Sequence, residues 1–339
     1  MLLERQRGRS GHPWVLPAAL GAAVVVLFAL SLAAGPAHIP LLDSLAGLAD
    51  AEPGVNSIIL REIRLPRSIL ALTVGATLGL SGAALQGLLR NPLAEPGLIG
   101  VSATAAFGSV VIFYFGLSAT YALALPLGGI AGALFAIVLL YSLAGREAGA
   151  LTLILSGVAV SSFAAALTSL ALNLAPSPYA ALEIVAWLLG SLADRSMDHV
   201  WLTLPLMLIG WGLLFSSGRA LEALTLGEDA ARSLGFSLRQ TQLQVILGTA
   251  LSVGAAVSVT GGIAFVGLVV PHLLRPWVGH RPQRLLLVSA FGGAALLLAA
   301  DTLVRVAPGP IELKLGVVTA LIGAPFFLYL LVRLRRERA

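Results

Sequence analysis

The sequence predicts an all-α polytopic membrane protein with about ten transmembrane helices, forming a single transmembrane domain over residues 1–339. Three observations carry this prediction. First, 58% of the 339 residues are hydrophobic and only 11% are charged, a composition too apolar for an ordinary soluble domain. Second, the charges are separated by uncharged stretches close to the length of about 20 residues that a helix needs to cross a membrane. Third, the basic residues segregate to one side of the spans counted in this way.

The uncharged stretches give the spans in order along the chain. Spans one to five are expected at residues 14–34, at 68–89, twice within 96–145, and from residue 148 to an extension through Pro176 and Pro178. Spans six to ten are expected at residues 200–218, twice within 240–274, at 285–300 and at 315–332. Turns near Gly116 and at residues 261–262 divide the two long stretches, and they leave spans three and eight short.

The distribution of basic residues gives the orientation of the spans. With the N-terminus inside, fifteen of the 21 basic residues fall in inner loops, as the positive-inside rule requires. Both termini are then cytoplasmic. The basic residues on the outer side are Arg61, Arg64, Arg67, Arg195, Arg305 and Lys314.

A short internal similarity indicates an inverted repeat. Residues 93–99 match residues 263–269 at a constant offset of 170. Five spans separate the two copies, and because five is odd the second copy has the opposite orientation, as in the inverted five-helix repeats of transporters. The repeat halves would cover about residues 60–175 and 236–334. In a chain this rich in Ala, Leu and Gly, a chance match is the alternative.

The residue types that are absent exclude several functions. The chain contains no Cys and its five His are scattered, so we expect no disulfide, no metal site and no cofactor. Its single lysine, Lys314, is not part of a phosphate-binding loop, and any ATP must therefore be bound by another chain. The net charge of +5 follows from membrane topology, and no basic cluster with interleaved aromatic residues indicates nucleic acid.

The expected membrane interior is nearly free of ionisable residues. Ion-coupled carriers usually need such groups within the membrane, so the sequence argues against a secondary carrier, whereas a passive channel stays compatible. An intramembrane serine protease is the competing enzyme class, with Ser81 as nucleophile and His272 as base. Ser81 lies in mid-span and His272 near the inner end, so we expect the two side chains at different depths.

One charged feature lies on the outer side of the membrane. Arg64 and Arg67 stand at the start of span two, and Arg305 follows span nine. These arginines either dock a partner, anchor lipid headgroups, or pair locally with Glu62 and Asp301.

A second charged feature is the inner segment from Gly227 to Gly235. Its acidic first turn and its flanking glycines predict a short surface helix. This segment is either a solvent-exposed helix within a loop or a binding surface for a partner.

Several motifs in combination resemble the FecCD family, the permease subunits of type II ABC importers for iron-siderophores, cobalamin and haem. The resemblance covers about residues 16–334. The motifs are RLPR at 64–67, the run 74–82, RNPLAEPG at 90–97, LSGVA at 155–159, Trp187 with Gly190-Ser191, LGEDAA at 226–231, GIAFVGLVVPH at 262–272 and TALIGAPFF at 319–327.

The resemblance implies partners and a cargo. Two permease subunits, identical or paralogous, form the pathway in the membrane lipid, two ABC ATPase subunits dock from the cytoplasm, and a substrate-binding protein delivers the cargo. The chain itself is then a transport subunit of the bacterial inner membrane and no enzyme. The cargo would be an iron(III)-siderophore or a related metal chelate, with cobalamin or haem as alternatives. An ATP-independent carrier or channel is the competing class.

The same resemblance assigns roles to residues. The residues that would couple the permease to the ATPase are Gly227, Glu228, Asp229, Ala230, Ala231, Arg232, Leu234 and Gly235. Docking of the binding protein falls on Arg64, Arg67 and Arg305. Spans five and ten would line the pathway, and its cytoplasmic gate would be formed by Asn91, Leu93, Ala150 and Leu151. One departure from the family pattern is Lys314, which stands where the family usually has Pro.

Overall fold

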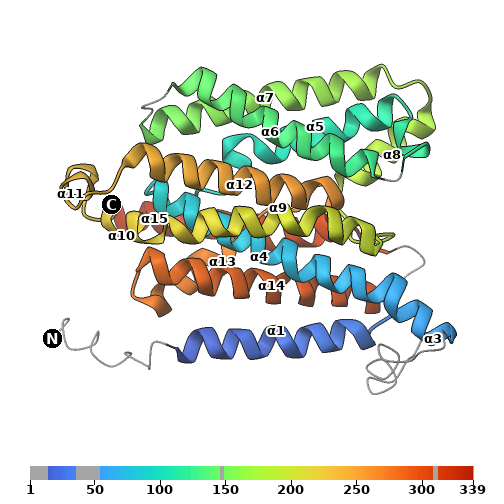
Figure 1. Ribbon diagram of the computed structural model, residues 1–339, viewed down its shortest axis with the longest axis horizontal. Coiled ribbons are helices and arrows are strands. Elements are labelled where there is room, and N and C mark those ends of the chain that lie inside the picture. Colours follow the sequence, from blue (N-terminus) through green and yellow to red (C-terminus); the bar gives the residue numbers. More distant parts are fainter. Residues whose placement is uncertain (1–13, 36–53, 122, 146–148, 308–311, 339) are drawn as a thin grey trace.

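The computed structural model describes residues 14–35, 54–121, 123–145, 149–307 and 312–338. Within these residues the fold is all-helical and contains no strand. Eight of the helices have the length and hydropathy to cross a membrane. Most of them lie side by side along one common direction (Figure 1). A helix suits the membrane interior because it satisfies its backbone hydrogen bonds within one segment.

The helices differ in length. The long ones are α1 (Val15–Ala33), the continuous helix Val55–Leu88, α6 (Ala124–Ala144), α7 (Ala150–Asn173), α9 (Met197–Ser216), α12 (Leu238–Thr260), α14 (Pro282–Val306) and α15 (Leu315–Arg338). The helix Val55–Leu88 consists of α3 (Val55–Ile58), the π-helical η2 (Ile59–Arg64) and α4 (Leu65–Leu88). The shorter α-helices are α5 (Val101–Tyr114), α8 (Pro178–Leu188), α10 (Gly218–Leu224), α11 (Glu228–Ser233) and α13 (Val266–Leu274). The 3-10 turns are η3 (Pro96–Ile99), η4 (Leu117–Ala119) and η5 (Arg275–Val278).

The prediction of about ten spans is confirmed, and the two short ones are α5 and α13. The predicted start of span two at residue 68 is wrong, because the helix begins at Val55. Counting charges excluded this stretch, yet the helix continues through Arg64 and Arg67 because both side chains find partners within the chain. Part of the orientation argument rests on residues 1–13, 36–53 and 146–148, which lie outside the described residues.

α4 lies at the centre of the bundle, since small residues let its neighbours approach closely. In the helix Val55–Leu88, 89% of the apolar stretch long enough to cross a membrane is buried, compared with 28% of the corresponding stretch in α7 and in α15. A β-carbon on Gly75 would collide with the carbonyl oxygen of Gly293 in α14, and one on Gly79 would collide with that of Ser289. Small residues four apart are a common means of close helix packing in membranes, and Gly75 and Gly79 serve it here.

α12 repeats the packing of α4 in the second half of the chain. α4 packs against α14 and α13, while α12 packs against α6 and α5. α4 and α12 run in opposite directions (Figure 1), and they meet where the Oγ atoms of Ser81 and Ser252 lie 3.4 Å apart. These equivalent contacts are those expected of an inverted repeat. The limits of its halves stay a prediction.

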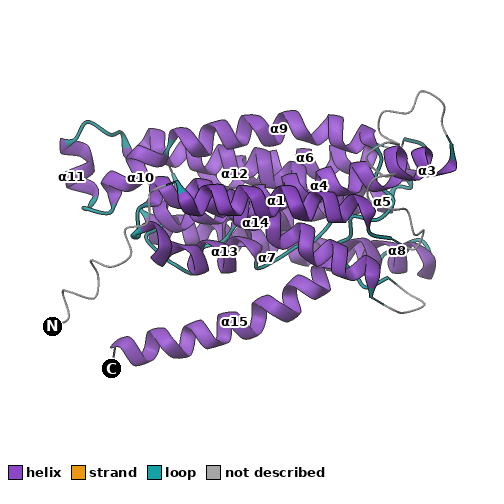
Figure 2. Cartoon of the chain, turned by 90° about the horizontal axis from the view of Figure 1, so that it is seen from below, coloured by secondary structure: helices purple, strands orange, loops and turns teal. Residues whose placement is uncertain are grey.

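The two ends of the bundle carry different elements. α11 stands beyond one end, which is the end at which α1 begins and α15 finishes (Figure 1). This end is called the inner end, and the opposite end, with α3 and α8, is called the outer end. α15 diverges from the bundle toward the inner end (Figure 2), in keeping with its low burial.

Candidate functional site

A short helix projects from the inner end where the sequence predicted one. α11 follows Gly227, whose φ is 106°, and it is closed by Gly235, whose φ is 85°. A residue with a β-carbon would be strained at both positions. Ala231 is fully buried beneath the helix, whereas the Asp229 side chain is fully exposed and Leu234 is 60% exposed. α11 is thus anchored on one face and open on the other.

One charged residue of α11 turns back toward the bundle. Nη2 of Arg90, the second residue after α4, lies 3.2 Å from Oε1 of Glu228. Asp229 pairs within its own helix, with 3.7 Å between its Oδ1 and Nη1 of Arg232. Glu228 therefore faces the chain, and Asp229 faces outward.

The predicted gate residues Asn91 and Leu93 lie in the turn that follows Arg90. Oδ1 of Asn91 accepts a hydrogen bond from the Leu93 N–H at 3.0 Å, and its carbonyl accepts one from the Ala94 N–H at 3.1 Å. Residues 91–94, called the gate turn, are therefore held by an Asx turn. Leu93 packs against a small apolar cluster that joins α13 to α15. The cluster consists of Leu268, Val269 and Leu330, with Leu93, Phe265, Phe326 and Phe327 packed against it.

The other two predicted gate residues, Ala150 and Leu151, open α7. Ala150 packs against the main core and lines a small hollow beside Glu228. Leu151 is 69% exposed. The four predicted gate residues thus form two separate groups within this chain, one beside α15 and one beside α11.

Sequence reasoning missed three hydrogen bonds at and beside α13. Gln86 in α4 donates from Nε2 to the Gly267 carbonyl at 3.3 Å, and its Oε1 accepts from the Arg275 guanidinium. The Glu95 carboxylate accepts from the backbone N–H of Phe265. Burial raises the pKa of Glu95, and this hydrogen bond opposes the rise. Gln86 is uncharged and lies in an apolar run, so counting charges gave no signal for it.

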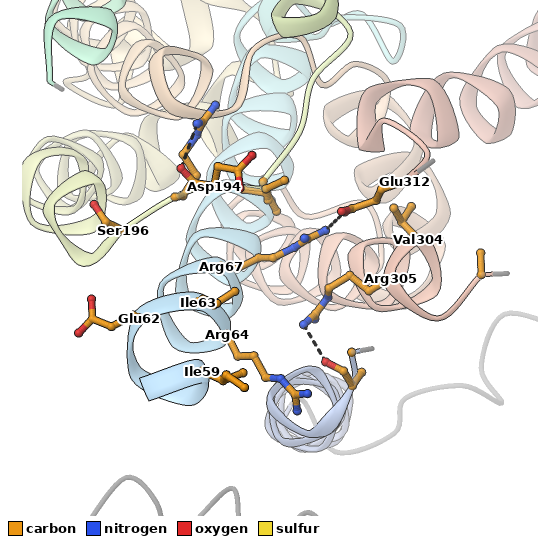
Figure 3. Close-up of a pocket in the computed structure, with 16 residues that line it drawn as sticks. Ile59, Glu62, Ile63, Arg64, Arg67, Asp194, Ser196, Val304, Arg305 and Glu312 are labelled. Carbon is orange, nitrogen blue, oxygen red and sulfur yellow. Dashed lines mark hydrogen bonds and ion pairs between the residues drawn. The ribbon is translucent and has the colours of Figure 1, made fainter. Parts of the chain in front are cut away.

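Four arginines line a pocket at the outer end, with a volume of about 660 Å³ (Figure 3). Its walls come from the end of α1, from η2 and α4, from the loop between α8 and α9, and from the end of α14. This space is called the outer pocket. Its charged lining residues are Arg64, Arg67, Arg195, Arg305, Glu62, Asp194 and Glu312.

Two of these arginines close the end of α1. Nη1 of Arg64 donates to the carbonyls of Leu32 and Ala33 at 2.9 and 2.8 Å. Nη1 of Arg305 donates to the carbonyls of Ser31 and Ala34 at 3.0 and 3.2 Å. The last carbonyls of a helix have no partner within it, and cations are favourable there. Arg64 and Arg305 therefore cap α1.

Arg67 is held by carboxylates. Its Nε and Nη2 donate to Oδ1 of Asp301 at 2.9 and 2.8 Å, and Nη2 also pairs with Glu312. Oδ2 of Asp301 lies 3.1 Å from Nε of Arg305. Asp301 is fully buried, while the Glu312 side chain is 40% exposed. One buried carboxylate thus serves two arginines.

The predicted docking residues are therefore turned inward. Arg64 is 3% and Arg67 is 8% exposed, and local pairing, one of the three alternatives, is what the structure shows for Arg67 and Arg305. The local partner is Asp301, whereas Glu62 points away from Arg64 (Figure 3).

The fourth arginine of the outer pocket was not assigned a role from the sequence. Nε of Arg195 donates to the Val259 carbonyl in the last turn of α12. Burial lowers the pKa of Arg195, and the charge of Asp194 opposes the shift. Arg195 therefore caps the C-terminal end of α12, as Arg64 and Arg305 cap that of α1.

The serine and histidine of the protease alternative have different neighbours. Ser81 is fully buried and contacts Ser252. The His272 ring lies edge-on to Phe326, with 5.7 Å between the ring centroids. Ser81 therefore packs at the crossing of α4 and α12, while His272 belongs to the contact between α13 and α15.

Helices of spanning length and glycine-mediated packing define a polytopic, all-helical membrane protein. Residues 23–333 match the FecCD transport family. The Fe(3+) dicitrate transport system permease protein FecD of Escherichia coli (strain K12) is 41% identical over 277 residues, covering 82% of this chain and 86% of the relative. The cobalamin import system permease protein BtuC of Halobacterium salinarum is 40% identical over 294 residues, covering 85% and 76%.

A solved structure gives the same result for the fold. It shows an inward-facing conformation of a transporter assigned to the metal-chelate type of ABC transporters, with a TM-score of 0.84 and 31% identity. The match covers 95% of this chain and 100% of that one. The chain belongs to the FecCD transport family, whose members are permease subunits of ABC importers.

Proposed function

We propose that this chain imports an iron(III)-siderophore or a related metal chelate across the bacterial inner membrane. Cobalamin and haem are the alternative cargoes, in line with the range of cargoes named for its relatives. The chain works with a second permease subunit, either another copy or a paralogue, with two ABC ATPase subunits, and with a substrate-binding protein. ATP is hydrolysed by the ATPase subunits and not by this chain.

The observation that carries this proposal is the exposed face of α11. Asp229, Arg232 and Leu234 project from the inner end, while Ala231 anchors the helix to the bundle. A short helix with an open charged face suits a cleft on an ATPase. Residues 227–235 are accordingly the coupling helix, and the inner end lies in the cytoplasm together with both termini.

The second permease subunit would cover the apolar faces of α7 and α15. Only 28% of the apolar stretch long enough to cross a membrane is buried in each of these helices. Leu155 of α7 and Leu321 of α15 are 61% and 70% exposed. The pathway would then run between two subunits, with the gate residues at its inner end. A pathway of apolar side chains releases a bulky chelate readily because it offers few hydrogen bonds to hold it.

The binding protein would dock over the outer pocket. The guanidinium groups of Arg64 and Arg305 are committed to α1, and Asp301 holds one edge of Arg67. The contact of Arg67 that a partner could replace is the one with the half-exposed Glu312. An acidic side chain of the binding protein would replace Glu312 on Arg67, and charge complementarity of this kind favours correct docking.

Uptake into proteoliposomes tests the proposal. The permease is reconstituted with its candidate ATPase and binding protein, and uptake of radiolabelled ferric siderophore, cobalamin and haem is measured with and without ATP inside. We expect uptake of one chelate class that requires ATP, the ATPase and the binding protein. Equal uptake without ATP would identify a carrier or a channel instead.

A further inference from the structure

The ion pair between Arg90 and Glu228 joins two parts of the chain to which the family resemblance assigns separate roles. The two residues are 138 positions apart, and the pair connects α11 to the residue that precedes the gate turn. Both side chains are close to half exposed, at 48% and 44%. Exposed pairs of this kind add little to stability, typically about 0 to 1 kcal/mol. Stability alone therefore gives little reason for the pair.

The backbone at Arg90 adds a second observation. Arg90 has a φ of 48°, in the left-handed region, which is where glycine or asparagine commonly ends a helix. Glycine would adopt this conformation without strain, but it carries no guanidinium. Strained backbone positions tend to occur at functional sites, and here the strained residue is the one that reaches Glu228.

The gate turn connects the Arg90–Glu228 pair to α13 and α15. Asn91 fixes residues 91–94 by its hydrogen bond to the Leu93 N–H, so a displacement of Arg90 moves the turn as one body. Leu93 packs against Leu268 and Val269 of α13 and Leu330 of α15. A continuous set of contacts therefore runs from α11 to the two helices beside the proposed pathway.

The neighbouring acidic residue of α11 shows a different arrangement. The Asp229 side chain is fully exposed and points away from the bundle, whereas Glu228 faces Arg90. The two adjacent carboxylates therefore have different tasks. Asp229 is placed to contact a partner, and Glu228 is placed to contact the gate turn.

We propose that the Arg90–Glu228 pair is the transmission contact that carries motion of α11 to the gate turn, and through Leu93 to α13 and α15. The inference rests on the proposed function, since it requires that α11 moves with the ATPase. An ATPase seated on α11 would shield the pair from water, and an ion pair strengthens as the surrounding dielectric falls. The contact would then be firmest when force is transmitted through it.

Charge reversal at each position, separately and together, tests this transmission. The variants are R90E, E228R and the double variant R90E/E228R, with D229R as the matched control for a reversed charge on α11. Three quantities are measured in the reconstituted complex: the ATPase that copurifies with the permease, its rate of ATP hydrolysis, and the cargo imported per ATP hydrolysed. The conservative variants R90K and E228Q complete the set.

We expect R90E to leave copurification of the ATPase unchanged and to lower import per ATP about fivefold, the low end of common coupling strengths. E228R should lower import per ATP similarly, and R90K should retain the wild-type value. The double variant R90E/E228R should restore most of the import per ATP. D229R should instead lower copurification.

Two results would overturn the inference: wild-type import per ATP in R90E, or a double variant that stays as impaired as either single variant while the ATPase still copurifies. If the ATPase fails to bind the wild-type permease at all, the proposed function fails, which is a separate result. E228Q removes the charge without reversing it, and it should lie between wild type and E228R. Misfolding of the reversed variants would be recognised by a loss of folded permease, and in that case the partial loss of import per ATP in E228Q and its retention in R90K test the inference.

Discussion

Arg67 and Asp301 are separated by 234 positions in the sequence, and their side chains form a buried two-point ion pair between α4 and α14. The same carboxylate also faces Arg305, with 3.1 Å between Oδ2 and Nε. Through these arginines the end of α1, the outer end of α4 and the outer end of α14 meet at one fully buried carboxylate.

The first prediction is that D301A destabilises the protein more than R67A does. Removing Asp301 leaves two largely buried guanidinium groups without their shared carboxylate, and breaking such a pair costs about 3 to 5 kcal/mol. Removing Arg67 leaves Asp301 paired with Arg305, so the loss is smaller. Thermal unfolding in detergent measures both variants.

E312Q serves as the control for this comparison, because the Glu312 side chain is 40% exposed and its neutralisation should cost under about 1 kcal/mol. Equal losses in D301A and R67A would contradict the shared-carboxylate arrangement.

The second prediction concerns docking and uses Glu312 in another assay. E312Q removes the charge that competes for Nη2 of Arg67, while the bond from Nη2 to Asp301 stays in place, so the binding protein should bind the permease about two- to fivefold more tightly, the range of a surface charge pair. The dissociation constant of the purified pair is the measurement. E222Q is the control, since Glu222 belongs to α10 at the inner end, and it should leave the dissociation constant unchanged. An unchanged constant in E312Q would place docking elsewhere on the outer end.

The third prediction concerns the contact between α4 and α14. G75A should lower the yield of folded protein and its unfolding temperature, because the new β-carbon meets the Gly293 carbonyl and overpacking costs about 1 to 3 kcal/mol. G212A is the matched control, since Gly212 in α9 has open space around it and alanine favours a helix. A stable G75A would show that α14 can move away from α4.

The fourth prediction concerns orientation. The chain has no native Cys, so a single introduced Cys is a clean reporter. In intact cells S142C, S233C and R281C should be shielded from an impermeant thiol reagent, while D198C should react, because the described structure places Ser233 and Asp198 at opposite ends of the bundle. Labelling of S233C from outside would reverse the assignment of the inner end.

The order of the helices was predictable because it rests on a local property. The length and apolar character of each uncharged run identify a span without reference to the rest of the chain. α1, α6, α12 and the break at Gly261 therefore lie close to their expected positions. The inner helix was predictable for the same reason, since two glycines and an acidic turn lie within nine residues.

The arrangement of the outer arginines was less accessible to sequence reasoning. The sequence allowed local pairing with Asp301 but gave no means to choose it over docking or lipid anchoring. That choice depends on which residues of α1, α4 and α14 meet, and the pair lies 234 positions apart. The same limit hid the contact between Gln86 and Arg275, where an uncharged side chain bonds to a residue of another helix. Long-range polar contacts of this kind leave no periodicity in the sequence.

The close packing of α4 against α14 and α12 has a consequence for how such transporters diversify. The residues that hold the subunit together lie in its centre, whereas the open faces of α7 and α15 contribute little to that centre. Under the proposed function these two faces line the pathway, so mutations there would alter which molecule passes without weakening the scaffold. Selection would then act on the open faces while the glycine contacts of α4 stay fixed, and one architecture would serve chemically unlike nutrients.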